Sequence, residues 1–366
     1  MEFQSIEMLY SINKIDEFLN LHKKYSDMPV CLYGAGRGLT WYIKFMKMHE
    51  ISITCIIDKN PGGENQVISL EEACSLYSQA IIVVSAPAHR EEITARVKSM
   101  APSYFVVSFD PTLDVLHGNE NHHDREKYYR QNKERISYIW NKLTDNTSKD
   151  TLVQMLKGAL TNDCDCYESL VSESQYFPDF IKQRLQSDEI FCDIGAYTGD
   201  TIEEFIKESD NKFKKIIAFE PDKINAEIAK SAFSDSRIKI YENGVGRKTE
   251  TLNFCNENGT DTDEGAHVVD ACQSHSSRIE VVALDEAVNE AVSYIKMDIE
   301  GMELEALMGA ENLIKKYKPK LAISVYHKTE DIIVIPEYIL NLELGYHLYL
   351  RHYWNCNGTD TVLFAV

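Results

Sequence analysis

Acidic residues stand at the ends of three apolar runs in the second half of the chain. Asp193, Glu220 and Asp298 each close such a run, and parallel sheets bind ligands beyond the carboxyl ends of their strands. Gly195 and Gly199 follow Asp193 in the stretch FCDIGAYTGDT, and glycines let backbone approach a ligand closely. The pattern then turns helical, and a helix N-terminus favours a negative group such as a carboxylate.

The spacing of these residues favours an adenosyl amino acid over a dinucleotide. The motif is Asp-x-Gly-x-x-x-Gly, not the Gly-x-Gly-x-x-Gly of dinucleotide sites. Glu220 closes the next predicted strand, where its carboxylate can accept hydrogen bonds from a ribose diol. S-adenosylmethionine fits this description, with its ammonium meeting Asp193 or a carbonyl and its carboxylate the helix end. The alternative is a tight β–α turn with incidental acids.

Asp298, Glu300 and His327 form the predicted catalytic cluster. If the ligand is S-adenosylmethionine, the reaction is a methyl transfer, which requires alignment of the nucleophile and, for an alcohol, removal of its proton. If the strand continues past Asp298, both carboxylates face the same side. A general base and an acidic metal site both remain open, because close carboxylates raise one pKa or recruit a cation. Glu300 is alternatively a cap of the following helix.

His327 closes the next predicted strand, KLAISVYH. Histidine is the right type for a base near neutral pH, although a hydrogen-bonded bystander is an equally good interpretation. His352, at another strand end, is a weaker candidate.

A second glycine-rich turn, YGAGRGL, lies in the first half of the chain. Gly34 and Gly36 match two glycines of the dinucleotide fingerprint, Leu39 replaces the third, and Asp58 closes the next strand. Three interpretations stay open for this half. It binds a nucleotide, it is a degenerate domain used for dimerisation or substrate presentation, or it is an NAD-dependent enzyme.

Strands that alternate with helices in both halves predict an α/β protein with two Rossmann-like domains. The predicted boundaries are a first domain over 1–115, a helical connector over 116–165, and a second domain over 166–366. The last two apolar runs, YHLYLRHYW and TDTVLFAV, predict an antiparallel hairpin that closes the second sheet. The polar stretch 256–278 is expected to shape the acceptor pocket.

The connector contains His122 and His123, followed by Asp124. These three could bind a metal, but a solvated loop is the favoured interpretation in so polar a segment. Cys164 and Cys166 form the only close cysteine pair, and ordinary thiols explain them better than a zinc site. The sequence thus predicts no metal site, with divalent-metal dependence left open.

Composition narrows the class of partner. The chain has 366 residues and a net charge of -20, which disfavours nucleic acids and anionic membranes. It shows no run of about 18 apolar residues and no signal-peptide pattern at its N-terminus, and its nine cysteines are expected to be reduced. We therefore expect a cytoplasmic protein with a small-molecule substrate and an open oligomeric state, including a homo-oligomer.

Residues 160 to 366 resemble the FkbM family of S-adenosylmethionine-dependent methyltransferases. The resemblance rests on CDIGAYTGDT, AFEPD, ALDE, YIKMDIEGMELEALMGAENLI and the terminal DTVLFAV, in this order. The resemblance implies a class I methyltransferase fold with a seven-stranded sheet. It also implies an enzyme that methylates a hydroxyl of a sugar, sugar nucleotide or related natural product. The cofactor site that it implies comprises Asp193, Gly195, Ala196, Gly199, Thr201 and Glu220.

Upstream of the fold, Tyr176 in SESQYFPDFI either covers the cofactor or packs against a helix. The first half resembles small Rossmann-like domains of sugar-modifying enzymes. Three rival functions remain: an N-methyltransferase, a non-catalytic nucleotide-binding sensor or scaffold, and an NAD-dependent reductase.

Overall fold

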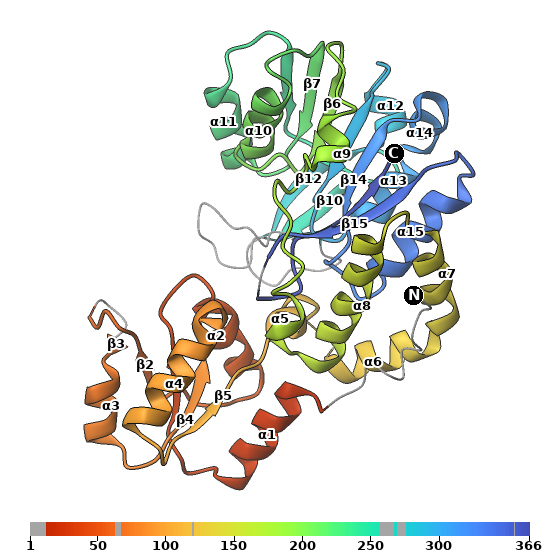
Figure 1. The fold of residues 1–366 in the computed structure, drawn as a ribbon. Coiled ribbons are helices and arrows are strands. Elements are labelled where there is room, and N and C mark those ends of the chain that lie inside the picture. The colour runs from red at the N-terminus through yellow and green to blue at the C-terminus, as the bar shows by residue number, and fades with distance from the viewer. Residues whose placement is uncertain (1–11, 63–66, 119–120, 256–266, 269–275, 355) are drawn as a thin grey trace. The chain divides into compact units, whose positions relative to one another are not determined.

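Two units make up the chain (Figure 1). The first unit contains residues 1–137, 150–171 and 354–359, and the second contains 138–149, 172–353 and 360–366. The computed structural model describes residues 12–62, 67–118, 121–255, 267–268, 276–354 and 356–366. Most of the polar stretch 256–278, predicted to shape the acceptor pocket, lies outside the described residues.

The first unit is built on a parallel sheet with strand order β3-β2-β1-β4-β5. Every residue of β1 and β4 is buried, as expected for central strands of a sheet covered on both faces. The strands are β1 (Val30–Tyr33), β2 (Cys55–Ile57), β3 (Val67–Ile68), β4 (Ile81–Val84) and β5 (Phe105–Val107). Its helices are α1 (Lys14–Lys24), α2 (Leu39–Met48), α3 (Leu70–Leu76), α4 (Arg90–Met100), α5 (Thr112–Leu116) and α6 (His122–Gln131), with 3-10 turns η2 (Pro87–His89) and η3 (Cys164–Cys166).

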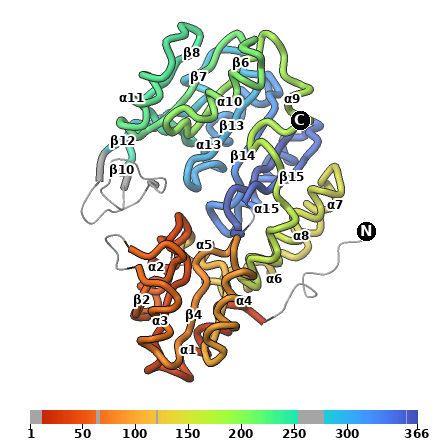
Figure 2. The backbone as a smooth tube through the Cα atoms, turned by 60° about the vertical axis from the view of Figure 1, so that its left-hand side comes forward, coloured from red at the N-terminus to blue at the C-terminus, as the bar shows by residue number. Residues whose placement is uncertain are grey.

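The second unit contains a sheet with the order β15-β16-β14-β13-β6-β7-β8. Figure 2 labels its strands β8, β7, β6, β13, β14 and β15. The pairs from β8 to β14 are parallel, and β16 pairs antiparallel with both β14 and β15. The strands are β6 (Ile190–Ile194), β7 (Lys215–Phe219), β8 (Ile238–Tyr241), β13 (Tyr294–Met297), β14 (Lys320–Ser324), β15 (Leu348–His352) and β16 (Thr361–Ala365).

Helices and a smaller sheet complete the second unit. The helices are α9 (Asp179–Lys182), α10 (Asp200–Glu208), α11 (Lys223–Ala232), α12 (Leu284–Ala287), α13 (Glu303–Met308), α14 (Glu311–Tyr317) and α15 (Asp331–Asn341). The smaller sheet has the order β11-β10-β12-β9. Its strands are β9 (Gly244–Val245), β10 (Glu250–Cys255), β11 (His267–Val268) and β12 (Ser276–Val282).

An aromatic core ties the central strands of the second unit to α10. The ring of Phe191, on β6, lies 4.5 Å from that of Phe205 on α10 and 5.2 Å from that of Tyr294 on β13 (centroid distances). Phe177 packs edge-on against Tyr294 at 5.9 Å. Each such aromatic pair adds about 0.5–1.5 kcal/mol beyond area burial. This packing fixes the strand ends at which the predicted site residues stand.

The α/β fold predicted from the sequence is confirmed. The connector predicted over 116–165 does not form a separate unit: residues 138–149 group with the second unit and the rest with the first. Helices α7 (Lys133–Lys142) and α8 (Asn146–Thr161) therefore each span a unit boundary. Among the described residues, no helix has the length and apolar character needed to cross a bilayer.

Candidate active site

The turn between β6 and α10 requires glycine at two positions. Gly195 and Gly199 have φ values of +79° and +95°, which L side chains rarely adopt. A Cβ on Gly195 would lie 1.9 Å from the carbonyl oxygen of Asp298, and one on Gly199 would lie 2.6 Å from the ring of Phe233. The chain after β13 and the Phe233 ring after α11 therefore leave no space for a side chain at these two positions, whether or not a ligand binds.

Asp193 is fully buried on β6 and faces a lysine that the sequence analysis did not single out. Lys296, its register partner on β13, places Nζ 3.2 Å from Asp193 Oδ1 and donates a hydrogen bond to the Gly195 carbonyl at 2.5 Å. Burial raises the pKa of Asp193 to about 6, against the lowering effect of Lys296. Burial lowers the pKa of Lys296, but the Asp193 carboxylate outweighs it, so that the net direction is upward. Asp193 therefore has its counter-ion within the protein.

Glu220, directly after β7, reaches back to the β6–α10 turn. Its Oε2 accepts a hydrogen bond from the Tyr197 amide at 2.8 Å, and its Oε1 accepts one from the Asp222 amide at 2.9 Å. Burial raises the pKa of Glu220 to about 7, although both backbone hydrogen bonds act to lower it. The carboxylate and the glycine turn, predicted to form one site, are therefore in direct contact.

Asp298 lies directly after β13 and accepts hydrogen bonds from two tyrosines. Tyr176 donates to Oδ2 at 2.7 Å and Tyr326 to Oδ1 at 3.3 Å. Burial acts to raise the pKa of Asp298, but His327 and Lys296 outweigh it and hold the pKa below its usual value. Asp298 is thus an ionised, oriented carboxylate whose side chain keeps 23% of its surface exposed.

His327 lies among three carboxylates. Its Nδ1 is 2.9 Å from Glu303 Oε1, and its Nε2 is 3.5 Å from Asp298 Oδ1 and 3.6 Å from Glu300 Oε2. Burial lowers the pKa of His327, but Glu303 and Glu300, followed by Asp298, outweigh it and raise the pKa to about 10. The ring is therefore a cation at neutral pH. This argues against the predicted role as a base, because an imidazolium has no free lone pair.

Glu300 lies near this cluster because of a turn, not because of the extended strand that the sequence analysis considered. Strand β13 ends at Met297, and Glu300 has a φ of +54° in the turn before α13. The alternation of an extended strand does not apply there. Glu303, which the sequence analysis missed, is fully buried and accepts a hydrogen bond from the Ile299 amide at 2.9 Å. It braces the turn and pairs with His327.

Asp298, Glu303 and His327 could also hold a metal ion, since one ligand atom of each lies within 4.8 Å of the others. A metal needs the neutral imidazole, because ligands must be deprotonated. The imidazolium and a metal therefore compete for the same carboxylates, and the raised pKa of His327 favours the proton.

Ala196 and Thr201 lie in or directly after the β6–α10 turn, whereas His352 lies on β15. Ala196 is fully buried, and its amide donates to the Phe219 carbonyl at 3.1 Å. Thr201 is buried in the first turn of α10. His352, the weaker catalytic candidate, is buried with Nδ1 2.9 Å from the Thr361 hydroxyl oxygen.

The glycine turn of the first unit repeats the arrangement around Glu220. Asp58 Oδ2 accepts a hydrogen bond from the Ala35 amide at 2.9 Å, and its Oδ1 accepts one from the Asn60 amide at 3.0 Å. A Cβ on Gly34 would lie 2.5 Å from that of Ala86, whereas one on Gly36 would meet no described atom within 4 Å. Gly34 thus serves strand packing, and Gly36 leaves open space at the turn.

Comparison with known proteins shows a likeness to one family of methyltransferases over part of the chain. Residues 193–348 match the family model described as the methyltransferase FkbM domain. A crystal structure of the methyltransferase FkbM from Methylobacillus flagellatus KT matches with a TM-score of 0.74 at 22% identity, covering 98% of this chain and 95% of that one. At this identity the likeness concerns the fold, and it extends over both units. None of the curated proteins matches the sequence.

Two further solved structures match about half of the chain. An rRNA methylase from Streptococcus thermophilus covers 51% of this chain and 91% of its own, at 17% identity and a TM-score of 0.32. A SAM-dependent methyltransferase from Aquifex aeolicus covers 56% and 97%, at 14% identity and a TM-score of 0.30. The match to the methyltransferase FkbM model covers residues 193–348, which lie within the second unit.

Proposed function

We propose that the second unit binds S-adenosylmethionine and transfers its methyl group to a hydroxyl of a carbohydrate or related small molecule. The observation that carries the proposal is the direct contact between Glu220 and the glycine turn after β6. It supports the proposal because Glu220 then stands beside the N-terminus of α10, where a carboxylate can accept hydrogen bonds from a ribose, within the residues that match the methyltransferase FkbM model. The net charge of -20 supports a small-molecule acceptor rather than a nucleic acid.

In this proposal Glu220 accepts hydrogen bonds from the ribose hydroxyls, and the amides that open α10 receive the carboxylate of the cofactor. Asp193, already paired with Lys296, holds the turn through Lys296 and the Gly195 carbonyl. The sulfonium supplies an electrophilic methyl group when the cofactor is bound. The protein has to align the acceptor and take up a proton.

Asp298 is the group we assign to that proton. With the cofactor bound, the acceptor hydroxyl would give its proton to the Asp298 carboxylate as its oxygen takes the methyl group. The sulfonium would keep the electron pair of its bond to that group and leave as the thioether of S-adenosylhomocysteine. Asp298 suits this role because Tyr176 and Tyr326 orient it and it retains an exposed surface. His327 acts as a fixed positive charge that keeps Asp298 ionised.

The first test is calorimetric binding of S-adenosylhomocysteine and of NADH to the full chain. We expect S-adenosylhomocysteine to bind, and Glu220→Ala to weaken that binding, while Glu242→Gln leaves it unchanged. Glu242 is a matched control because it is an exposed acid after β8 that pairs with Lys230. Binding of NADH alone would favour a reductase, and binding without turnover on any hydroxyl or amine acceptor would favour a sensor.

We also propose that the first unit binds a nucleotide at its own glycine turn. Asp58 accepts a hydrogen bond from the Ala35 amide as Glu220 does from the Tyr197 amide, and a Cβ on Gly36 would meet no described atom within 4 Å. The test is saturation transfer or calorimetry with nucleoside diphosphates and nucleotide sugars. Asp58→Asn is expected to weaken binding. No binding by the wild-type chain would leave a scaffold role for this unit.

A further inference from the structure

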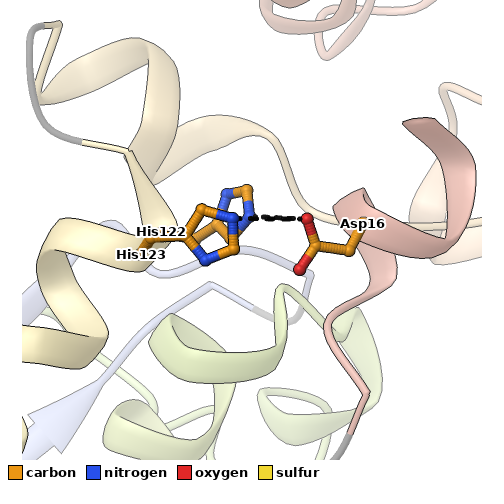
Figure 3. A group of neighbouring side chains, drawn as sticks. All are labelled: Asp16, His122 and His123. Carbon is orange, nitrogen blue, oxygen red and sulfur yellow. Dashed lines mark hydrogen bonds and ion pairs between the residues drawn. The ribbon is translucent and has the colours of Figure 1, made fainter. Parts of the chain in front are cut away.

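Three side chains of the first unit converge far from the methyltransferase domain in sequence. Asp16 lies on α1, and His122 and His123 lie on the first turn of α6; Figure 3 shows them pointing toward one another. Asp16 Oδ1 is 3.2 Å from His122 Nε2 and 3.5 Å from His123 Nε2. One ligand atom of each residue lies within 4.8 Å of the others.

These separations match the edges of a tetrahedral zinc site. Zinc binds imidazole nitrogen and carboxylate oxygen at about 2.0–2.2 Å, so that neighbouring ligand atoms lie about 3.3–3.6 Å apart. The two separations from Asp16 Oδ1, 3.2 and 3.5 Å, lie within or close to that range. Two imidazoles with one carboxylate is also a ligand set that suits zinc rather than magnesium or calcium.

A buried carboxylate fixes the orientation of His122. Asp114 Oδ2 lies 2.9 Å from His122 Nδ1, and the other oxygen of Asp114 pairs with the guanidinium of Arg125. Asp114 and Arg125 are both essentially inaccessible to solvent. A carboxylate on the far nitrogen of a histidine is the usual support of a metal-binding imidazole, because it selects the tautomer with a lone pair on Nε2. That lone pair faces Asp16.

Capping interactions fix the two helix ends that carry the ligands. The Asn13 side chain accepts hydrogen bonds from the amides of Ile15 and Asp16. Asn121 and Asp124 form a capping box at the start of α6. The sequence analysis named Asp124 as the third possible metal ligand, but Asp124 takes part in the helix cap. Asp16 is the carboxylate that lies beside the two histidines. The expected solvated loop is also wrong, because the His122 side chain is only 5% exposed.

The geometry of the cluster leaves room for a cation. The rings of His122 and His123 have centroids 4.2 Å apart, and both Nε2 atoms face the same oxygen of Asp16. A divalent cation placed among these three atoms can bind all of them at once.

We propose that Asp16, His122 and His123 bind a zinc ion, with water as the fourth ligand. The site opens to solvent on the side of His123, whose side chain is 63% exposed, and of Asp16, at 36%. The ion joins α1 to α6 across 106 residues of sequence. Its expected effect is to stabilise the first unit, and this inference does not depend on the proposed methyl transfer.

The test is titration of the chelator-treated full chain with zinc chloride, followed by calorimetry and by thermal unfolding. We expect one zinc equivalent that depends on these residues, and a higher unfolding temperature when it is bound. Outer-shell partners change metal affinity by about 10–100-fold, so His123→Ala, which removes a direct ligand, should weaken binding by at least about tenfold. Asp16→Asn should do the same.

Two matched variants make the test specific. His89→Ala removes a histidine with the same 63% exposure and a lone carboxylate neighbour at 3.9 Å, and it should leave zinc binding unchanged. Glu303→Gln removes one carboxylate from the Asp298, Glu303 and His327 cluster of the second unit. It should leave the zinc equivalent at Asp16, His122 and His123 unchanged. The proposal is overturned if His123→Ala binds zinc like the wild type, or if Glu303→Gln abolishes the equivalent. Absence of binding by the wild type would overturn it too, and would mean that a doubly protonated His122 ring, which donates from Nδ1 to Asp114 and from Nε2 to Asp16, explains the geometry.

Discussion

The carbonyl oxygen of Asp298 occupies the space that a side chain on Gly195 would need. A Cβ on Gly195 would lie 1.9 Å from that oxygen and 2.9 Å from the carbonyl carbon. The two residues follow β6 and β13, which pair in parallel register. The proposed cofactor turn and the proposed base are therefore held next to each other by the close approach of their backbones.

We expect Gly195→Ala to destabilise the second unit by several kcal/mol and to abolish binding of S-adenosylhomocysteine. Adding a Cβ at positive φ costs about 1–2 kcal/mol, and the clash with strand backbone adds to this cost. Gly345→Ala is the matched control, since its φ is +80° but its Cβ would meet no described atom within 4 Å. Denaturant unfolding of the two variants measures the difference. If both variants lose the same free energy of unfolding, then the ends of β6 and β13 can move apart to accommodate the added Cβ.

Glu220 should make cofactor affinity depend on pH. Its pKa is raised to about 7, whereas ribose hydroxyls bind the carboxylate form. Below pH 7 the site must release a proton on binding, so we expect the affinity for S-adenosylhomocysteine to fall about tenfold per pH unit there. Above pH 7 the affinity should level off. Calorimetry between pH 5.5 and 8.5 measures this, and Glu220→Gln should remove the dependence. An unchanged pH profile in that variant would assign the titration to another group.

Asp298 and Glu300 can be separated by their amide variants. Asp298→Asn should lower kcat by on the order of 100-fold or more, the usual contribution of a general base, with little change in the affinity for S-adenosylhomocysteine. Glu300→Gln should have the smaller effect, because Glu300 lies in the turn and contacts His327 at 3.6 Å. Single-turnover methyl transfer measures both. The reverse order of effects would make Glu300 the base.

A chelator should leave methyl transfer unchanged. The imidazolium of His327 already supplies the positive charge among Asp298, Glu300 and Glu303, so a metal is not needed to keep these carboxylates ionised. The measurement is turnover before and after treatment with EDTA. Loss of activity that magnesium or manganese restores would instead place a metal at Asp298, Glu303 and His327. Zinc held by Asp16 in the first unit should not affect the outcome.

The sequence was sufficient to predict the α/β fold and the strand ends at which acids meet a glycine turn. Both depend on local patterns: apolar runs, glycines at turns and acids that close a strand. Lys296 escaped notice because one lysine in the run YIKM does not interrupt a strand pattern, and its role depends on Asp193 across the sheet. Buried lysines are rare unless paired, which is the signal that could have found it.

Other residues could not be found from local patterns at all. The sequence analysis did not single out Glu303, yet Glu303 is buried in the fold beside His327. Asp16 meets His122 only because α1 packs near α6 within the first unit. The protonation of His327 likewise depends on three carboxylates gathered by the fold. Sequence spacing locates candidate groups, whereas their charges follow from tertiary neighbours.

His327 should also make stability depend on pH. Its pKa is about 10 in the folded chain and about 6.5 when unfolded. The stabilising contribution is therefore fully present below about pH 6.5 and is lost as pH rises through about 10. Burial and Glu303 raise the pKa of Asp331 to about 8. The free energy of unfolding that Asp331 contributes therefore also falls as pH rises, over a range that ends near pH 8. Between pH 8 and 10 the His327 contribution should fall by up to about 1.4 kcal/mol per pH unit.

The measurement is the free energy of unfolding from pH 6 to 10 for the wild type and His327→Gln. The variant should be less stable near neutral pH and should show a smaller decline between pH 8 and 10. His352→Gln is the matched control, because His352 is a buried histidine of the same unit whose Nδ1 lies beside the Thr361 hydroxyl. It should keep the wild-type slope. If His327→Gln keeps that slope as well, then His327 is neutral in the folded chain, and it becomes available again as the base that the sequence first suggested.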